Sequence, residues 1–239
     1  MEVIVAGYVE YDALLPALIA SYTASTTSHL LGLEKFSVDV QEIWKIGDVK
    51  NAGILVILGL AFGLTGRGFS VLLQKTKKLA GDKISNPLVR IGCLAIPLAV
   101  ILLALHGARY SGLGTNLITA SFTGDTIYRY DWILKLLLTI ATLAIGFQGG
   151  EVTPLFSIGA SLGAVLGSVF GISPVICASL GYAAVFGSAT NTVIAPILIG
   201  LEVFGSQNAI PLVVVCLLAY MVNGNHSIYG AQVKALCSF

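Results

Sequence analysis

Long runs of apolar residues, separated by short polar stretches, dominate the hydropathy pattern of the chain. Eight apolar segments lie near residues 13–33, 53–73, 88–106, 132–147, 154–170, 174–188, 192–204 and 209–222. A helix needs about 20 apolar residues to cross a bilayer, and only the first three or four segments approach that length. The pattern predicts an all-α integral membrane protein.

The later segments are short and are interrupted by Gly, Pro, Ser and Asn. Short, broken apolar segments are typical of discontinuous membrane helices whose ends meet at a binding site. Backbone breaks are tolerated at membrane depth where they line a cavity or are buried in protein. We therefore expect the functional site in the second half of the chain.

Composition agrees with a lipid environment, because 56% of the residues are hydrophobic and 10% are charged, against about a quarter charged in soluble domains. The net charge of +1 offers no basic face to a nucleic acid, so none is expected as a partner. No HExxH pair, GxSxG elbow or phosphate-binding glycine loop occurs, and an enzyme is not expected.

Cysteines and histidines show no metal-ligand spacing, so neither a metal site nor another cofactor is expected. We interpret the cysteines as small buried hydrophobic residues. They are Cys93, Cys177, Cys216 and Cys237.

Two polar linkers separate the long segments and differ in charge. Residues 34–50 mix acidic and basic side chains, whereas residues 74–90 carry five basic side chains against one acidic side chain, Asp82. The positive-inside rule places the second linker in the cytoplasm. Its basic cluster is interpreted as a topological signal, with binding of lipid headgroups as the alternative.

One carboxylate, Glu151, stands at the head of a ladder with a glycine at every fourth residue. Pro154 suits the first turn of a helix, where its missing N–H costs nothing. The unpaired N–H groups at residues 150–153 and the positive end of the helix dipole predict an anion site. The ladder, which gives the helix a smooth face for close packing, consists of Gly159, Gly163, Gly167 and Gly171.

Glu151 lies in apolar surroundings between Phe147 and Phe156, where a carboxyl group can take and release protons near neutral pH. Its negative charge would oppose an anion at the neighbouring amides. We therefore expect protonation of Glu151 and anion binding to be positively coupled. The alternative is a carboxylate that only favours the positive end of its own helix.

These motifs follow an order that resembles the C-terminal half of the CLC family of chloride channels and proton-coupled antiporters. The stretches that carry the resemblance are 149–156, 159–163, 181–184, 191–196 and 225–231. The resemblance implies a CLC-like inverted-repeat helical bundle with short discontinuous helices. It also implies a central halide site, made by Gly150, Glu151, Val152, Thr153 and the hydroxyl of Tyr229.

Several of these residues have simpler alternatives. Tyr229 would otherwise be an aromatic residue at the membrane interface. Phe147 and Phe156 would line the anion path unless they only pack against neighbours, and aromatic ring edges carry partial positive charge. Thr153 would donate to a small anion unless its hydroxyl bonds to the backbone.

Glu151 and Thr153 make this stretch similar to the fluoride/proton antiporter branch of the family. The resemblance favours proton-coupled fluoride export, in which Glu151 carries the proton. A CLC-type chloride channel or chloride/proton antiporter is the alternative. The helix from Thr192 to Phe204 is similar to one at the family's dimer interface, which implies a homodimer with Thr192 and Glu202 at that interface. For Glu202, a structural cap or ion pair is the alternative.

The resemblance also implies how the chain is organised. Residues 1–33 would end the first repeat, residues 34–50 would be a polar linker and residues 51–239 would form the second repeat. The gating glutamate and the anion-site loop of the first repeat have no counterpart in residues 1–60. We expect a single incomplete membrane domain of a protein of the bacterial plasma membrane. A transport-inert fragment that only assembles with a partner is a further hypothesis.

Overall fold

The computed structural model describes residues 5–6, 11–33, 36–45, 47–230 and 232–234. The elements in these ranges are β1 (Val5–Ala6), η1 (Tyr11–Ala13), α1 (Leu14–Leu30), α2 (Val49–Lys83), α3 (Pro87–Ala104), α4 (Thr115–Thr123), α5 (Asp131–Ile145), α6 (Val152–Phe170), α7 (Pro174–Thr190), α8 (Ile194–Phe204), α9 (Ala209–Asn223) and β2 (Val233–Lys234). The two short strands pair in parallel. Helices make up nearly all of the regular structure, which confirms the predicted fold class.

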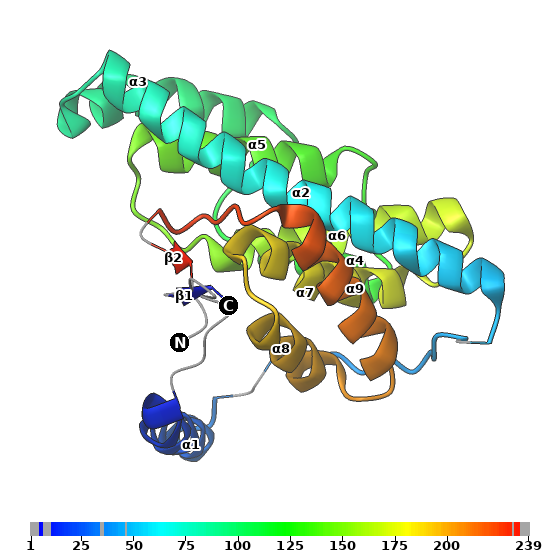
Figure 1. Cartoon of the computed structure of the whole chain (residues 1–239). Helices are drawn as coiled ribbons and strands as arrows, with labels where there is room; N and C mark the ends of the chain where they lie inside the picture. Colours follow the sequence, from blue (N-terminus) through cyan, green and yellow to red (C-terminus); the bar gives the residue numbers. More distant parts are fainter. Residues whose placement is uncertain (1–4, 7–10, 34–35, 46, 231, 235–239) are drawn as a thin grey trace.

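Helices α6 and α7 pack against each other at the centre of the molecule. The long helix α2 runs diagonally across them and across α9, and α3 follows at its far end (Figure 1). Helices α4 and α5 cover α6, while α8 packs on α7 and α9. Helix α1 stands apart and buries none of its residues. The start of α6 therefore lies within a frame made by α2, α5 and α7.

Three glycines of the ladder bring α6 and α7 into backbone contact. A Cβ on Gly163 would lie 2.7 Å from the Cα of Ala178, and one on Gly167 would lie 2.8 Å from the Cα of Pro174. Gly159 meets the backbone of Gly181 in the same way. This is the close approach that small residues permit between membrane helices.

Gly171, the last glycine of the ladder, has a different role. Its φ is +67° and it ends α6. The N–H of Ile172 donates to the carbonyl of Gly167 at 2.9 Å, which is the bond of a Schellman motif. Gly171 therefore terminates the helix instead of packing against a neighbour.

The predicted polar linker 74–90 is mostly helical, so that boundary was wrong. Helix α2 continues through Lys83, and α3 begins at Pro87. Lys, Leu, Gln and Ala favour helix, and the charged residues extend α2 without a break. The helix boundary lies at Asn86, whose Oδ1 accepts from the N–H of Leu88 and caps α3.

Helix α4 was not predicted, because nine residues rich in Thr and Ser give no strong apolar run. Left-handed glycines, Gly114 and Gly124, stand at its two ends. Helix α6 is longer than predicted. It has 19 residues. In the described part of the chain, three helices are long and apolar enough to cross a membrane: α2, α3 and α6.

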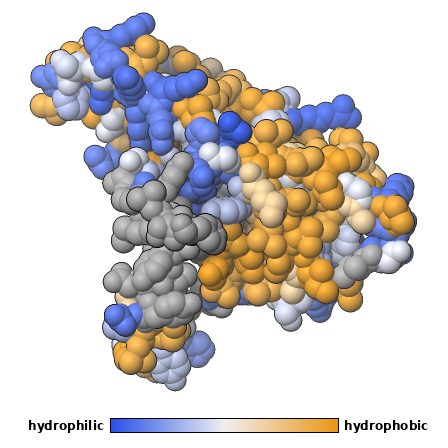
Figure 2. Space-filling model, viewed as in Figure 1, coloured by the Kyte–Doolittle hydropathy of each residue, from blue (hydrophilic) through white to orange (hydrophobic). Residues whose placement is uncertain are grey.

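A broad hydrophobic surface covers the part of the molecule where α8 and α9 lie, whereas hydrophilic residues gather where α2 passes into α3 (Figure 2). Ile210 and Met221 of α9 are 62% and 72% exposed. Exposed apolar surface of this extent indicates contact with lipid or with another protein surface.

The cysteines follow the prediction only in part. Cys177 and Cys216 are buried, as predicted. Cys93 is exposed, because α3 packs mainly on α5 and leaves its other side open. Cys237 lies outside the described residues.

Candidate anion site at the start of helix α6

Glu151 is the N-cap residue of α6, but its carboxylate makes no capping hydrogen bond. Instead, Oε1 of Glu151 lies 3.0 Å from Nζ of Lys77 on α2. The Glu151 side chain is 19% exposed and that of Lys77 is 43% exposed. The carboxylate is therefore turned away from its own helix and toward a cation on a neighbouring one.

The backbone donors at the start of α6 stay free of protein acceptors. In the described part of the chain, no carbonyl accepts a hydrogen bond from the N–H of Val152 or Thr153. Pro154 is buried in the first turn and has no N–H to satisfy. Two amides and the helix dipole are available to an anion.

Tyr229 lies beyond the end of α9, in a segment fixed to the end of α7. The N–H of Ile228 donates to the carbonyl of Ala189, and Ser227 donates to the carbonyl of Thr190. Burial, together with the negative charge of Glu151, raises the pKa of the Tyr229 hydroxyl above its usual value. The hydroxyl therefore keeps its proton at neutral pH and can donate to an anion.

Helix α2 contributes a polar face that sequence reasoning missed. One side of this helix carries Arg67, Gln74 and Lys77. Gln74 lies about two turns after Arg67, and Lys77 lies about three turns after it. Arg67 donates to the carbonyl of Val222, and Gln74 donates to that of Ser227. The basic residues had a visible signal, because cations inside a membrane helix are costly and mark functional sites.

Near the start of α6, Thr153 and Phe156 line one cavity, and Phe147 lines another. Phe156 stacks on Tyr182, with ring centroids 4.0 Å apart. Thr153 borders a cavity of about 320 Å³ beside these two rings. Phe147 is 37% exposed and borders another cavity, of about 230 Å³, with Gly150 and Pro154. Of the predicted residues, Glu151 acts on the Tyr229 hydroxyl through its charge, while Phe156 belongs to an aromatic cluster with Tyr182 and Phe186.

The residues expected at a dimer interface have contrasting surroundings. Thr192 is buried, and its hydroxyl lies 2.7 Å from that of Thr190. Glu202 is exposed on α8, next to Leu198, which is 59% exposed. The exposed face of α8 therefore carries Glu202, whereas the Thr192 side chain points into the chain.

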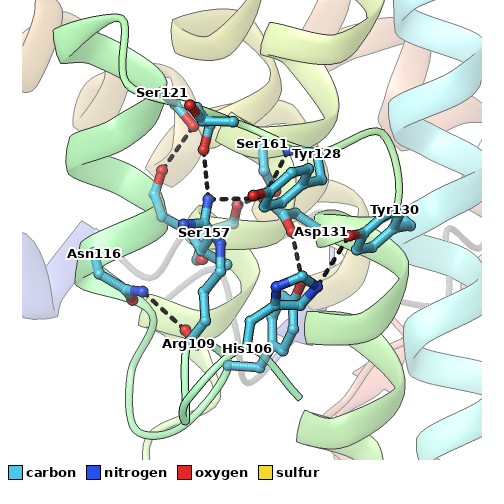
Figure 3. A network of polar contacts seen from close by, with 12 residues as sticks. His106, Arg109, Asn116, Ser121, Tyr128, Tyr130, Asp131, Ser157 and Ser161 are labelled. Carbon is cyan, nitrogen blue, oxygen red and sulfur yellow. Dashed lines mark hydrogen bonds and ion pairs between the residues drawn. The ribbon is translucent and has the colours of Figure 1, made fainter.

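A buried charge network, also missed from the sequence, holds the start of α5 (Figure 3). Asp131 is fully buried and accepts from Arg109 at 2.9 Å and from the Tyr110 hydroxyl at 2.6 Å. The guanidinium of Arg109 lies over the ring of Tyr128. The backbone N–H of Tyr128 also donates to Asp131. Burial and the hydrogen bond to Asp131 raise the pKa of Tyr110. The network fixes the loop before α4 to α5.

Replacing Asp131 with Asn is expected to lower the free energy of unfolding by about 3 kcal/mol, because it leaves a partly buried guanidinium without its counter-ion. The midpoint of thermal unfolding in detergent measures the change. Asp125→Asn is the matched control, since Asp125 is exposed and, among the described residues, its side chain accepts only from Thr123. Equal midpoints for the two variants would contradict a stabilising role for the network.

Comparisons with known proteins agree on one family. The profile of the family described as voltage gated chloride channel matches residues 1–224. A chloride/fluoride channel protein of Pseudomonas syringae pv. tomato is 33% identical over 238 residues, which are 97% of this chain and 52% of that protein. An H(+)/Cl(-) exchange transporter ClcA of Yersinia pestis is 26% identical over 199 residues, 76% of this chain and 41% of that protein.

Solved structures give the same result. The crystal structure of a CLC-type fluoride/proton antiporter matches with a TM-score of 0.95 and 50% sequence identity, over 98% of this chain and 59% of that chain. A eukaryotic CLC transporter matches with a TM-score of 0.70 and 19% identity, over 95% of this chain and 40% of that chain, and supports the fold alone.

The chain spans about half the length of the relatives it matches. These relatives are named as channels, transporters and antiporters. The match of the family profile over most of the sequence, together with the structural agreement, confirms the predicted resemblance: the chain belongs to the voltage gated chloride channel, or CLC, family.

Proposed function

We propose that this chain forms the second half of a proton-coupled fluoride exporter. The observation that carries the proposal is the position of Glu151, which stands at the start of a helix whose first amides have no protein acceptor in the described part of the chain and is paired with Lys77 instead of capping those amides. The likeness to a CLC-type fluoride/proton antiporter at 50% identity favours fluoride. A chloride channel or chloride/proton antiporter is the alternative, and it has support from the name of the Pseudomonas syringae relative.

In this proposal the anion accepts hydrogen bonds from the amides of Val152 and Thr153 and from the hydroxyl of Tyr229. Gly150 leaves room at the helix start, and the Thr153 hydroxyl and the ring of Phe147 border the route. Glu151 binds a proton when it leaves Lys77 and releases it when it returns. The neutral carboxyl group no longer repels an anion at the adjacent amides, which couples the two ions.

The remaining parts of the proposal concern assembly. Residues 51–239 form the second repeat, joined by the linker 34–50 to the last helix of the first repeat within residues 1–33. The exposed face of α8, with Glu202, contacts a second copy in a homodimer, and Thr192 holds the start of that helix. The complete protein would lie in a bacterial plasma membrane and would supply the remaining anion ligands from its first repeat.

Replacing Lys77 with Met is expected to shift the pH dependence of proton-coupled flux to higher pH. The substitution removes the cation that lies 3.0 Å from the Glu151 carboxylate, and loss of a nearby opposite charge favours the neutral form of a carboxyl group. Flux through the complete protein in vesicles, measured at a series of pH values, tests this.

Lys78→Met serves as the control, because Lys78 is the exposed neighbour of Lys77 on α2. It removes the same charge from the same end of the helix. If both variants shift the profile equally, or neither does, the ion pair with Glu151 has no part in coupling.

Vesicles that contain the complete protein distinguish the candidate functions. A fluoride/proton exporter releases trapped fluoride faster than chloride and takes up protons in exchange. Faster release of chloride would favour the chloride alternatives. Vesicles that contain residues 1–239 alone are expected to release neither ion, because half of the anion ligands are missing.

A further inference from the structure

A second cation, Lys135, lies buried beside the proposed anion site. It belongs to α5, is 1% exposed, and donates from Nζ to the carbonyls of Tyr110 at 3.0 Å and Gly112 at 2.7 Å. An ammonium group has three donors, so these bonds leave one. In the described part of the chain no carboxylate pairs with Lys135, although Asp131 lies one turn away on the same helix.

The two carbonyls alone do not account for this charge. A neutral donor such as an amide would satisfy them without the cost of burying a cation. Asp131, the nearest acid along α5, is already occupied by Arg109 and Tyr110. A buried cation in a membrane protein is a mark of an ion pathway, and in the described part of the chain Lys135 has carbonyl partners but no carboxylate partner.

Lys135 borders a cavity that reaches the start of α6. The cavity has a volume of about 230 Å³, and its walls include Lys135, Gly112, Gly149, Gly150 and Pro154. A water takes up about 30 Å³ in the liquid, so the cavity has room for a small anion with several waters. Glu151 does not line it, so an anion beside Lys135 would not meet that carboxylate directly.

An unpartnered hydroxyl lies next to the Lys135 side chain. Ser157 is fully buried, and its Oγ has no hydrogen-bond partner among the residues that the structure describes. Ser157 Oγ and Lys135 Cε lie 2.6 Å and 2.7 Å from the point that a Cβ on Gly114 would occupy. Ser157 is one turn beyond Pro154 on α6 and is drawn in Figure 3. Gly114 has no side chain, which leaves room for these two side chains to approach its backbone.

We propose that Lys135 and Ser157 form an auxiliary binding station for a small halide, reached through the cavity beside Gly149 and Gly150. This inference rests on the proposed function in one respect: the anion at the station is taken to be the transported anion. It holds the anion near the start of α6 while Glu151 is ionised. Protonation of Glu151 then opens the amides of Val152 and Thr153 to it.

Titration calorimetry of the complete protein in detergent, with sodium fluoride and sodium chloride in turn, tests the station. Lys135→Met is expected to remove one anion per subunit from the binding stoichiometry, or to weaken that site at least tenfold. Ser157→Ala is expected to weaken it about threefold. Thr139→Val is the matched control, because Thr139 lines the same cavity one turn along α5 without a charge.

Unchanged stoichiometry and affinity for both ions in Lys135→Met would overturn the station. If that variant does not fold, Ser157→Ala decides alone, and affinity equal to that of the parent protein would overturn the station. If the parent protein binds chloride but not fluoride at this site, and Lys135→Met loses that binding, the station is supported and the fluoride assignment is overturned. A loss equal in Thr139→Val would assign the effect to the cavity wall instead of the cation.

Discussion

Replacing Glu151 with Gln is expected to reduce proton movement through the complete protein to the level of protein-free vesicles. Gln keeps the shape and polarity of the side chain but cannot exchange a proton. The ion pair with Lys77 is lost, while the free amides of α6 are unaffected, so the anion site itself persists. A pH electrode and a fluoride electrode on the same vesicle suspension measure the two ions together.

Glu202→Gln is the matched control for this variant. It removes one carboxylate from the exposed face of α8, a helix that packs on α7 and α9. It is expected to leave the ratio of the two ions unchanged. Proton-coupled flux of normal size in Glu151→Gln would remove Glu151 from the coupling.

Replacing Gly163 with Ala is expected to destabilise the fold by about 3 kcal/mol or more. The added Cβ would lie against the backbone of Cys177 and 2.7 Å from the Cα of Ala178. Backbone atoms of a packed helix cannot move aside as a flexible side chain can, so α6 and α7 must separate. The start of α6 depends on this packing, because the two helices form the centre of the molecule.

Gly92→Ala makes the same chemical change in open space. A Cβ on Gly92 of α3 meets no atom within 4 Å, so the variant is expected to be stabilised by about 0.5–1 kcal/mol, the gain from Gly to Ala inside a helix. Thermal unfolding in detergent measures both. Similar midpoints for the two variants would contradict the close packing of α6 on α7.

The start of helix α6 was predicted well from the sequence. Pro154 and the glycine spacing specify a helix start and a smooth face by local rules that need no knowledge of the rest of the fold. The same rules could not name the helix that Gly159 and Gly163 contact. They also treated Gly171 as a fourth packing residue, although its left-handed backbone ends the helix.

Lys77 shows why the rest of the site was missed. It is 74 positions from Glu151 in the chain, and hydropathy assigned it to a polar linker. Lys77 lies beside Glu151 because α2 continues through that linker. A hydropathy pattern does not indicate this continuation, because the residues of the linker are charged. Asp131 and Lys135 had a clearer signal, since charged residues in or beside the apolar segment 132–147 are costly enough to mark a functional or structural centre.

Uphill movement of protons is the measurement that tests the role of Glu151 most directly. Vesicles with the complete protein are loaded with fluoride and diluted into fluoride-free medium at equal pH on both sides. Fluoride leaving down its gradient is expected to draw protons inward until a pH difference develops, and chloride at the same gradient is expected to develop a smaller one. Fluoride release without any pH difference would contradict proton coupling through Glu151.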